Sequence, residues 1–550
     1  MRFIFTFLGV LLYTVLFPYA GISDNGSFLA DKNKYTTAIV QQEPVVSVPD
    51  PNFKAYLVGN SAINTNGDEE IQVSEAEGFT GSIDCKNKNI SDLTGIEAFT
   101  HIKALDCSRN QLTTLDVSKN TALTNLFCDT NQLTALDVSE NAALIYLRCF
   151  NNLLTTLDVS KNITLEILYC SENQLSALDV SKNIALTNLR CFDNQLTTLD
   201  VSKNAALLSL ACDLNQLTTL DVSKNTALKG LDCSGNQLTM LDVSKNTALL
   251  SLACNLNQLT TLDVSKNIAL KGLGCSDNQL TALDVSNNIF LEDLYCDSNQ
   301  LTMLDVSENT ALIYLSCESN QLNTLDVSNN IFLENLYCES NQLTALDVRN
   351  TALAYLYCGF NQLTTLDLNK NIVLEVLFCE SNQLISLDMS KNAALDYFIC
   401  ENNRLTALNI KNGNNYNMSD NVFRIDNNPD LKCVEVDDAA YSTANWTHKD
   451  AATIYSEDCS EIVATQAVDG SQKNAVFPNP SEGLVYIRKA GHLRHATIRV
   501  VGSLGQLIPA KVRSEGDRWM IDMTEAVPGL YFVCIEADGK TVAIEKVIKR

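Results

Sequence analysis

The chain has 550 residues, a hydrophobic content of 46% and a formal net charge of −26 at pH 7. This length exceeds what one hydrophobic core normally serves, so several domains or a repeat array are expected, and the apolar content excludes wholesale disorder. The negative charge excludes nucleic acid as an expected partner, disfavours anionic membrane surfaces and favours cationic ligands.

The N-terminus, "MRFIFTFLGVLLYTVLFPYAGIS", is typical of a secretory signal peptide. Arg2 provides the positive start, the apolar run from Phe3 to Phe17 is short for a membrane span, and small residues follow it. We predict a signal peptide over 1–23, a linker over 24–44 and export of the chain. No later stretch is long and apolar enough to span a bilayer, so no transmembrane segment is expected in the mature chain.

Residues 45–88 are predicted to form a helix–loop–helix cap. The spacing of the loop resembles an EF-hand, with polar side chains at positions 1, 3, 5 and 12 supplied by Asn64, Asn66, Asp68 and Glu75. Two features count against calcium: position 1 is an asparagine, and position 6 is Glu69 where glycine normally allows the turn. Calcium is the only cofactor that the sequence suggests.

A block of 21 residues then recurs along the chain. Aligned on the asparagine before "QL", its copies begin at Asn89, Asn110, Asn131, Asn152, Asn173, Asn194, Asn215, Asn236, Asn257, Asn278, Asn299, Asn320 and Asn341, then at Asn361 (one position early), Asn382 and Asn403. A fixed period between twenty and thirty predicts a solenoid, in which each coil buries its apolar face against its neighbours. We place this solenoid over residues 89–412.

Each block has the pattern L-x-x-L-x-C-x-x-N-x-L, which is that of a leucine-rich repeat with cysteine in place of the third leucine. Alternation predicts that Leu168 and Cys170 point inward from a short strand while Ile167 and Tyr169 point outward. Stacked at strand spacing, about fifteen coils would extend on the order of 70 Å. The asparagines are expected to satisfy backbone groups of adjacent coils, and the aspartates of "LDV" to form an exposed, turn-bonding row.

The repeated cysteines predict one inward-facing column of packed thiols, since a thiol is a small apolar group that suits a tight core. Side chains in parallel register lack the dihedral that a disulfide requires, so neither a redox nor a metal site is expected. The column comprises Cys107, Cys128, Cys149, Cys170, Cys191, Cys212, Cys233, Cys254, Cys275, Cys296, Cys317, Cys338, Cys358, Cys379 and Cys400.

Beyond the repeats, residues 413–462 are predicted to form a C-terminal cap. Cys433 and Cys459 lie off the thiol column, and pairing between them is expected in an exported chain. A linker over 463–474 leads to residues 475–550, where short alternating runs and glycine-containing turns predict a small β-sandwich.

The 21-residue units with their cysteine resemble those of the cysteine-ladder internalins, bacterial leucine-rich-repeat surface proteins, over residues 45–412. That resemblance implies binding of a macromolecule through the concave strand face. The motifs "FPNPSEGLVYI", "GSLGQLI", "DMTEAVPGLYFVCI" and "KVIKR" resemble the sorting domain of type IX secretion cargo. This second resemblance implies contact with the type IX machinery and export to the surface or surroundings of a Gram-negative bacterium. Internalins usually carry wall-binding tails, so host invasion does not follow from the likeness.

The fold expected is therefore a leucine-rich-repeat solenoid of 21-residue coils with parallel strands on its concave face, an α-helical N-cap and a C-terminal all-β sandwich sorting domain. An enzyme is not expected. The chain has only four histidines, and no Ser-His-Asp or Cys-His motif accompanies them.

Outward strand positions carry the information about binding. The residues at these positions are small in the middle coils, and an aromatic and acidic stripe follows in the C-terminal half. A smaller cluster lies in the N-terminal coils and consists of Tyr146, Arg148, Phe150, Tyr169, Arg190 and Phe192. Exposed aromatics are frequent at binding hot spots, and stacked like charges are unfavourable without a partner. The predicted ligand-binding residues are Tyr295, Asp297, Tyr314, Glu318, Tyr337, Glu339, Tyr355, Tyr357, Phe378, Glu380, Tyr397 and Glu401.

The sequence thus favours a secreted or surface-displayed, adhesin-like protein that binds a protein or glycan, with a basic partner fitting the acidic row best. Two alternatives stay open: a structural envelope or matrix component without a discrete ligand site, and a calcium-dependent glycan binder.

Overall fold

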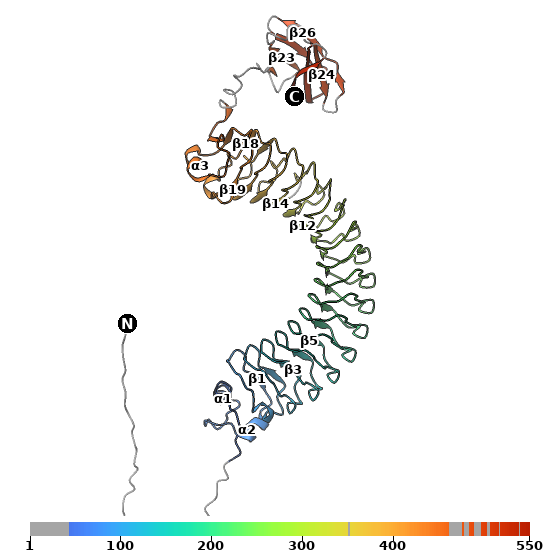
Figure 1. The fold of residues 1–550 in the computed structure, drawn as a ribbon, viewed down its shortest axis with the longest axis vertical. Coiled ribbons are helices and arrows are strands. Elements are labelled where there is room, and N and C mark those ends of the chain that lie inside the picture. The colour runs from blue at the N-terminus through green and yellow to red at the C-terminus, as the bar shows by residue number, and fades with distance from the viewer. Residues whose placement is uncertain are drawn as a thin grey trace, which may run out of the picture.

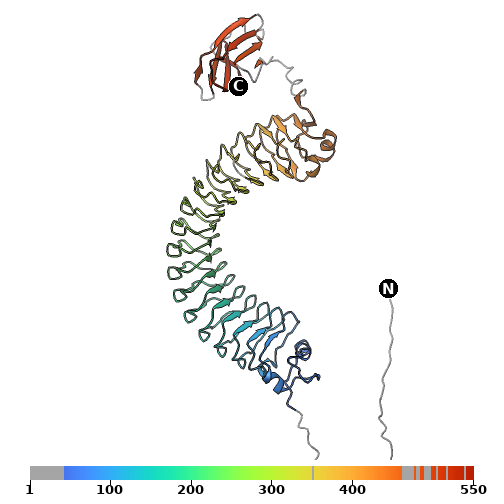
Figure 2. The same cartoon turned by 180° about the vertical axis from the view of Figure 1, so that it is seen from behind.

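The computed structural model describes residues 43–349, 352–460, 476–477, 483–488, 497–502, 506–515, 518–537 and 540–549. The predicted signal peptide (1–23), residues 24–42 of the first linker and the second linker (463–474) lie outside the described residues. The repeats form a curved solenoid with its strands on the inner side of the arc (Figures 1 and 2). The predicted leucine-rich-repeat fold is confirmed.

Two short helices and their loop cover the N-terminal end of the solenoid. Helix α1 (Pro51–Val58) begins at Asp50, whose carboxylate accepts hydrogen bonds from the backbone N–H groups of Asn52 and Phe53. Helix α2 (Val73–Gly78) begins with a reciprocal capping box, and a 3-10 turn, η1 (Ile96–Ala98), follows in the first coil. Phe53 is fully buried and helps to seal the core of this coil.

One parallel sheet runs along the concave face, and within the described residues it contains 17 strands. Each strand pairs with its counterpart one coil on, without a register shift, so that Leu168 lies opposite Leu189. The strands are β1 (Ser82–Asp84), β2 (Ala104–Asp106), β3 (Asn125–Phe127), β4 (Tyr146–Arg148), β5 (Ile167–Tyr169), β6 (Asn188–Arg190), β7 (Ser209–Ala211), β8 (Gly230–Asp232), β9 (Ser251–Ala253), β10 (Gly272–Gly274), β11 (Asp293–Tyr295), β12 (Tyr314–Ser316), β13 (Asn335–Tyr337), β14 (Tyr355–Tyr357), β15 (Val376–Phe378), β17 (Tyr397–Ile399) and β19 (Phe423–Arg424).

The sheet extends beyond the predicted solenoid at both ends, because each cap contributes strands. β1 precedes residue 89, and β19 follows residue 412. A second parallel sheet at the C-terminal end contains β16 (Ser386–Asp388), β18 (Ala407–Asn409), β20 (Cys433–Glu435) and β21 (Ile454–Ser456). The caps therefore continue the coil geometry, and the core is not left open at either end.

The C-terminal cap closes the core with aromatic packing and a disulfide. Its 3-10 turn η2 (Asn415–Asn417) and helix α3 (Ala439–Asn445) lead to the fully buried Trp446, whose ring stacks on Phe423 with 4.0 Å between centroids. Cys433 and Cys459 are joined by a disulfide with a Cα–Cα distance of 5.8 Å.

The cysteine ladder is present, and it begins one coil earlier than predicted. All fifteen predicted members are buried free thiols, and Cys85 extends the column into the first coil. The alignment of Asn89 with the asparagine column is wrong. Cys107 follows Cys85 by 22 positions rather than 21, so Lys88 stands opposite Asn110 and Asn89 is exposed. The extra residue lies between Ile90 and Cys107, because the spacing from Cys85 to Ile90 equals that from Cys107 to Leu112.

Buried asparagines connect each coil to the one before it, as the sequence analysis anticipated. The amide nitrogen of Asn236 donates hydrogen bonds to the carbonyls of Cys212, Cys233 and Ser234 at 3.0–3.1 Å. Its oxygen accepts from the N–H of Leu217 at 2.9 Å. One side chain thus satisfies four backbone groups on two coils, which explains why the residue recurs.

The back of each coil repeats a second arrangement. The fully buried Asn246 donates to the carbonyls of Val222 and Asn225, and the exposed Asp242 accepts a hydrogen bond from the N–H of Ser244 at 2.9 Å. That hydrogen bond lowers the pKa of Asp242. The "LDV" aspartates are therefore turn residues, each bound to its own chain.

The C-terminal part folds into two antiparallel sheets that share one apolar core, including Trp519 and Val533. The first contains β22 (Val476–Phe477), β23 (Leu484–Arg488), β26 (Lys511–Glu515) and β27 (Arg518–Asp522). The second contains β24 (Thr497–Gly502), β25 (Leu507–Ile508), β28 (Gly529–Ala537) and β29 (Lys540–Lys549). Among the described residues, no helix has the length and apolar character needed to cross a membrane.

Candidate ligand-binding face

Five aromatic rings form a continuous stack across the C-terminal half of the concave sheet, in which the three middle rings are stacked face to face and the two end rings are tilted by 33° and 58°. The first and third residues of each strand face the concave side, and the second is buried. The ring centroids lie 4.6 to 5.2 Å apart from one strand to the next over β11 to β15. The stack consists of Tyr295, Tyr314, Tyr337, Tyr357 and Phe378.

Tyr314 joins this stack from a different strand position than the other four rings. It is the first residue of β12, and the third position there is held by the small Ser316. The ring of Tyr314 therefore occupies the space that a third-position side chain would fill. The remaining predicted aromatics stay outside the stack: Tyr355 donates its hydroxyl to the Glu375 carboxylate at 3.0 Å, and Tyr397 is 47% exposed.

A row of acidic side chains runs beside the rings, because the residue after each cysteine faces the same side. The acidic side chains at the two ends of the row have hydrogen-bonding or ionic partners. Asp297 accepts hydrogen bonds from the hydroxyls of Ser276 and Ser316 at 2.6 and 3.1 Å, and Glu401 forms an ion pair with Arg424 at 2.9 Å.

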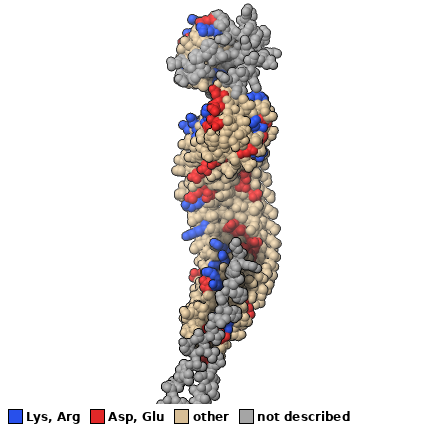
Figure 3. Space-filling view, turned by 90° about the vertical axis from the view of Figure 1, so that its left-hand side faces the viewer, with Lys and Arg blue, Asp and Glu red and all other residues tan. Residues whose placement is uncertain are grey.

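In the middle of the row, Glu318, Glu339 and Glu380 form no ion pair within the described residues, although the charge of Arg424 acts on Glu380 and opposes the rise of its pKa. Burial, together with the charges of Glu380 and Glu318, raises the pKa of Glu339 to about 7. Burial also raises the pKa of Glu380, and the Oε2 atom of Glu380 is buried without a hydrogen-bond partner in the described part of the chain. Figure 3, which faces the concave side, shows acidic side chains recurring over the C-terminal coils.

Phe360 is an exposed aromatic of this region that the sequence analysis missed. Its side chain is 55% exposed, and its backbone has the left-handed φ of 53°. The equivalent positions in neighbouring coils hold Ser340 and Ser381, also with positive φ. The sequence could have indicated Phe360, because it is a bulky aromatic at a position where the two neighbouring coils have serine.

The smaller N-terminal cluster is internally paired. Arg148 forms an ion pair with Asp129 at 2.7 Å and lies over the ring of Phe127, and neither partner was predicted. The Asp129 side chain is only 1% exposed, and burial raises its pKa despite the nearby guanidinium. Arg190 lies over the Tyr169 ring at 4.6 Å. Pairing of this kind leaves Arg148 little freedom to bind a ligand.

Between the two clusters the concave face is hollow, since its side chains are small. The residues that line this hollow include Ser209, Ala211 and Gly230, together with Arg190 and Asp213. Burial and the charge of Asp232 raise the pKa of Asp213 to about 6. These middle coils separate the paired N-terminal cluster from the unpaired acids of the C-terminal half.

The EF-hand-like loop satisfies its own polar groups. Both carboxylate oxygens of Glu75 accept hydrogen bonds, from the N–H groups of Thr65, Asn66 and Gln72 and from the Thr65 hydroxyl. The amide nitrogen of Asn64 donates to the carbonyls of Val58 and Asp68, and that of Asn66 donates to the Asp68 carboxylate. A bound calcium needs oxygens in these places, so the side chains as arranged do not fit one.

The turn at position 6 also departs from the EF-hand. Gly67, at position 4, has a positive φ, whereas Glu69 does not. Over the described ranges, no group of three or more His, Cys, Asp or Glu residues is placed to hold a metal.

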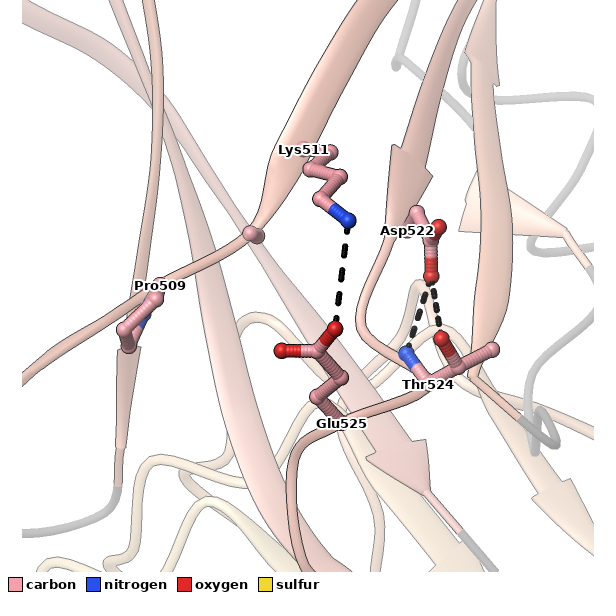
Figure 4. Close-up of a pocket in the computed structure, with 6 residues that line it drawn as sticks. Pro509, Lys511, Asp522, Thr524 and Glu525 are labelled. Atoms are coloured by element: carbon pink, nitrogen blue, oxygen red, sulfur yellow. Dashed lines mark hydrogen bonds and ion pairs between the residues drawn. The ribbon is translucent and has the colours of Figure 1, made fainter.

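A further hollow lies in the C-terminal sandwich beside Pro509 (Figure 4). Lys511 and Glu525 approach to 3.8 Å across it, and the Asp522 carboxylate accepts hydrogen bonds from the N–H and hydroxyl of Thr524. The Lys511 and Glu525 side chains are largely exposed, so this surface pair contributes little to stability. The Asp522 contacts fix a turn.

The coil geometry, the buried thiols and the asparagine columns define a leucine-rich-repeat protein of the cysteine-ladder type. The solved functional domain of InlJ from Listeria monocytogenes, which includes a cysteine ladder, shares 30% identity with the chain at a TM-score of 0.58. The match covers 91% of this chain and 97% of that one. The chain belongs to the internalin family of leucine-rich-repeat proteins.

Other relatives agree on the fold. A leucine-rich-repeat protein of Leptospira interrogans is 24% identical with a TM-score of 0.53. The match covers 57% of this chain and 88% of the Leptospira chain. The ectodomain of a plant membrane receptor kinase from Arabidopsis thaliana, solved with CASPARIAN STRIP INTEGRITY FACTOR 2, is 20% identical with a TM-score of 0.54. That match covers 65% of this chain and 46% of the ectodomain. These two likenesses concern the fold alone.

Sequence matches cover shorter parts of the chain. Internalin J of Listeria monocytogenes serotype 4b (strain F2365) is 41% identical over 73 residues, or 13% of this chain, and the chain spans 8% of the length of that protein. Residues 475–550 match the secretion system C-terminal sorting domain. The chain therefore combines an internalin-like solenoid with a secretion sorting domain.

Proposed function

We propose that this protein binds a basic polypeptide at the bacterial surface through the C-terminal half of its concave sheet. The observation that carries the proposal is the juxtaposition of five aromatic rings with Glu318, Glu339 and Glu380, which form no ion pair within the described residues. Aromatic rings offer a large rigid contact area, and unpaired carboxylates are unfavourable until a cation arrives. No arrangement that supports catalysis accompanies them in the described residues.

Selective capture of a partner tests the proposal. The secreted chain and its double variant Tyr337→Ala/Tyr357→Ala serve as baits against envelope extracts and host lysates, with folding of both checked by circular dichroism. We expect a basic protein on the wild type alone. The matched control is Tyr397→Ala, which removes an exposed ring outside the stack and should keep the partner.

Other results of the capture would count against the proposal. A partner kept by the double variant would move recognition to the caps or the back of the coils. Capture of nothing by either bait, together with self-association at high concentration, would favour a structural matrix role instead.

We infer further that the protein reaches the cell exterior by type IX secretion from a Gram-negative cell. The support is the match of residues 475–550 to the sorting domain together with the predicted signal peptide. Truncation after residue 462 should leave the solenoid in the periplasm, as measured by fractionation and immunoblotting. Equal surface display of the truncated chain would contradict this route.

A further inference from the structure

An apolar ridge runs along one side of the solenoid, at the turn that precedes each concave strand. From Asn120 to Asn392, the second residue after the buried asparagine of the back is alanine or threonine in every coil except three. Those three coils have phenylalanine or valine there, each preceded by isoleucine. The ridge consists of Ile289, Phe290, Ile331, Phe332, Ile372 and Val373.

All six side chains of the ridge are exposed to solvent, at 48 to 63%. Because the concave strands pair without a register shift, equivalent positions of successive coils line up and the six side chains form one row. Together they expose roughly 600 Å² of apolar area, the upper end of what a monomer usually presents as one patch. Two such surfaces provide about the 1,200 Å² at which specific interfaces begin.

The ridge has a notch at every second coil. Ala311 lies between Phe290 and Phe332, and Ala352 lies between Phe332 and Val373. At about 4.8 Å per coil the two phenyl rings are roughly 10 Å apart, so a third ring placed over Ala311 would lie about 5 Å from each of them. Rings at that separation form favourable aromatic pairs. Each notch therefore has the width that one phenyl ring needs.

The ridge and its notches are complementary to themselves. In a two-fold pair with antiparallel solenoids, one register sets Phe332 over Ala311 of the second copy. The same register sets Phe290 over Ala352 of the second copy, and the symmetry supplies the reciprocal contacts, so that four rings enter four notches. The period of two coils therefore selects a second copy of this chain as the partner, because that copy has the same period.

The neighbouring charges change at the same coils. The residue before the buried asparagine is an exposed lysine in six successive coils: Lys161, Lys182, Lys203, Lys224, Lys245 and Lys266. In the three coils that contain Phe290, Ala311 and Phe332, this residue is Asn287, Glu308 or Asn329. Two copies that met along the lysine column would set like charges against each other, whereas the coils of the ridge have no such column.

We propose that the apolar ridge is a homodimer interface, in which two antiparallel copies of the chain insert their phenylalanines into each other's notches. The pair is closed, because one isologous contact uses the ridge of both copies, and so it differs from the open-ended self-association of a matrix component. This inference goes beyond the binding of a polypeptide by the concave face, and the dimer would present two such faces in one assembly.

Sedimentation velocity of the full secreted chain at about 1 to 100 μM tests the proposal. We expect a concentration-dependent dimer. Phe290→Ser/Phe332→Ser should raise its dissociation constant by at least about a hundredfold, because four ring contacts are lost per dimer. Ala311→Trp should also prevent the dimer although it leaves every side chain of the ridge in place, since the indole fills the notch.

Two matched controls make the same kinds of change outside the ridge. Ile184→Ser removes a lone exposed apolar side chain, and Ala248→Trp enlarges a half-buried alanine equivalent to Ala311. Both should dimerise as the wild type does, with folding of all variants checked by circular dichroism. The inference would be overturned by a wild type that stays monomeric, by a dimer that survives both ridge variants, or by species larger than a dimer that grow with concentration.

Discussion

Each buried asparagine of the first column holds two coils together through its amide group alone. Asn236 makes four hydrogen bonds to backbone groups, and its side chain is 8% exposed. Neither aspartate nor alanine could donate these bonds, and aspartate would also bury a charge. The recurrence of this residue is thus explained at the scale of single atoms.

Asn236→Ala should lower the free energy of unfolding by about 2–4 kcal/mol, because several buried backbone groups lose their partner. Urea denaturation followed by circular dichroism measures the loss. Asn287→Ala removes an exposed asparagine from the back of a coil and should change stability by less than about 0.5 kcal/mol. Similar losses in the two variants would contradict the role assigned to the column.

A second residue-scale prediction concerns the pKa of Glu339, which lies near 7 in the folded chain against an ordinary value of 4.5. An acid whose pKa is raised on folding gives up its proton more readily in the unfolded state, so stability falls as the pH rises between these two values. The groups that face it are Glu318 and Glu380, both acidic.

Glu339→Gln cannot ionise and should escape that loss. The variant should match the wild type near pH 4.5 and be the more stable of the two above about pH 7, as urea midpoints at several pH values would show. Glu308→Gln, at an exposed position on the back of the coil, serves as the control. A constant difference between Glu339→Gln and the wild type across this range would contradict the prediction.

At the scale of elements, the N-terminal cap loop is predicted to be held by Glu75 and not by calcium. Its carboxylate joins helix α2 to Thr65 and Asn66, and its oxygens are already occupied by N–H and O–H donors. Millimolar calcium should therefore leave the melting temperature unchanged, measured by calorimetry with and without a chelator. Glu75→Ala should lower it by about 2–4 °C. A rise of several degrees in the melting temperature with calcium would contradict this prediction and support a calcium site in the loop.

The repeat pattern determines which elements form, because one inward face serves the leucines, the thiols and the asparagines of every coil. The pattern failed in the first coil because Lys88 holds the asparagine position three residues after the buried Cys85, and Asn89 lies 21 residues before Asn110 only because the coil has one extra residue. Alignment on the apolar pair of Ile83 and Cys85, which the core constrains, would have found the first coil. Alignment on the asparagine did not, because the first coil has lysine at that position.

The candidate site was less predictable than the fold, since its residues are not constrained by the core. Sequence alone placed Tyr337 and Tyr357 on the concave face, but Tyr355 and Tyr397 belong to the other outward column and do not join the stack. The ring of Tyr314 enters the stack because Ser316 is small, and Glu380 fills space left by Gly359. Such packing between neighbouring coils depends on side-chain volumes that no single repeat reveals.

On the scale of the whole molecule, the thiol ladder runs through the solenoid as one continuous core. Sixteen of the described cysteines are buried free thiols, and Cys534 is half-buried in the C-terminal sandwich. Burial raises the pKa of Cys170 to about 12, and that of Cys212 is also well above its ordinary value. A thiol that neither ionises nor meets solvent reacts slowly.

Titration with a thiol reagent tests this for the intact protein. In native conditions we expect Cys534 alone to react, because it is the described free cysteine that solvent reaches. Unfolding in guanidinium should release seventeen thiols, the nineteen cysteines of the chain less the two in the Cys433–Cys459 disulfide. Reduction before unfolding should raise the number to nineteen. A count well below seventeen would mean that neighbouring coils are crosslinked, in which case the core would be oxidised and the ladder would store disulfides instead of packing as an apolar column.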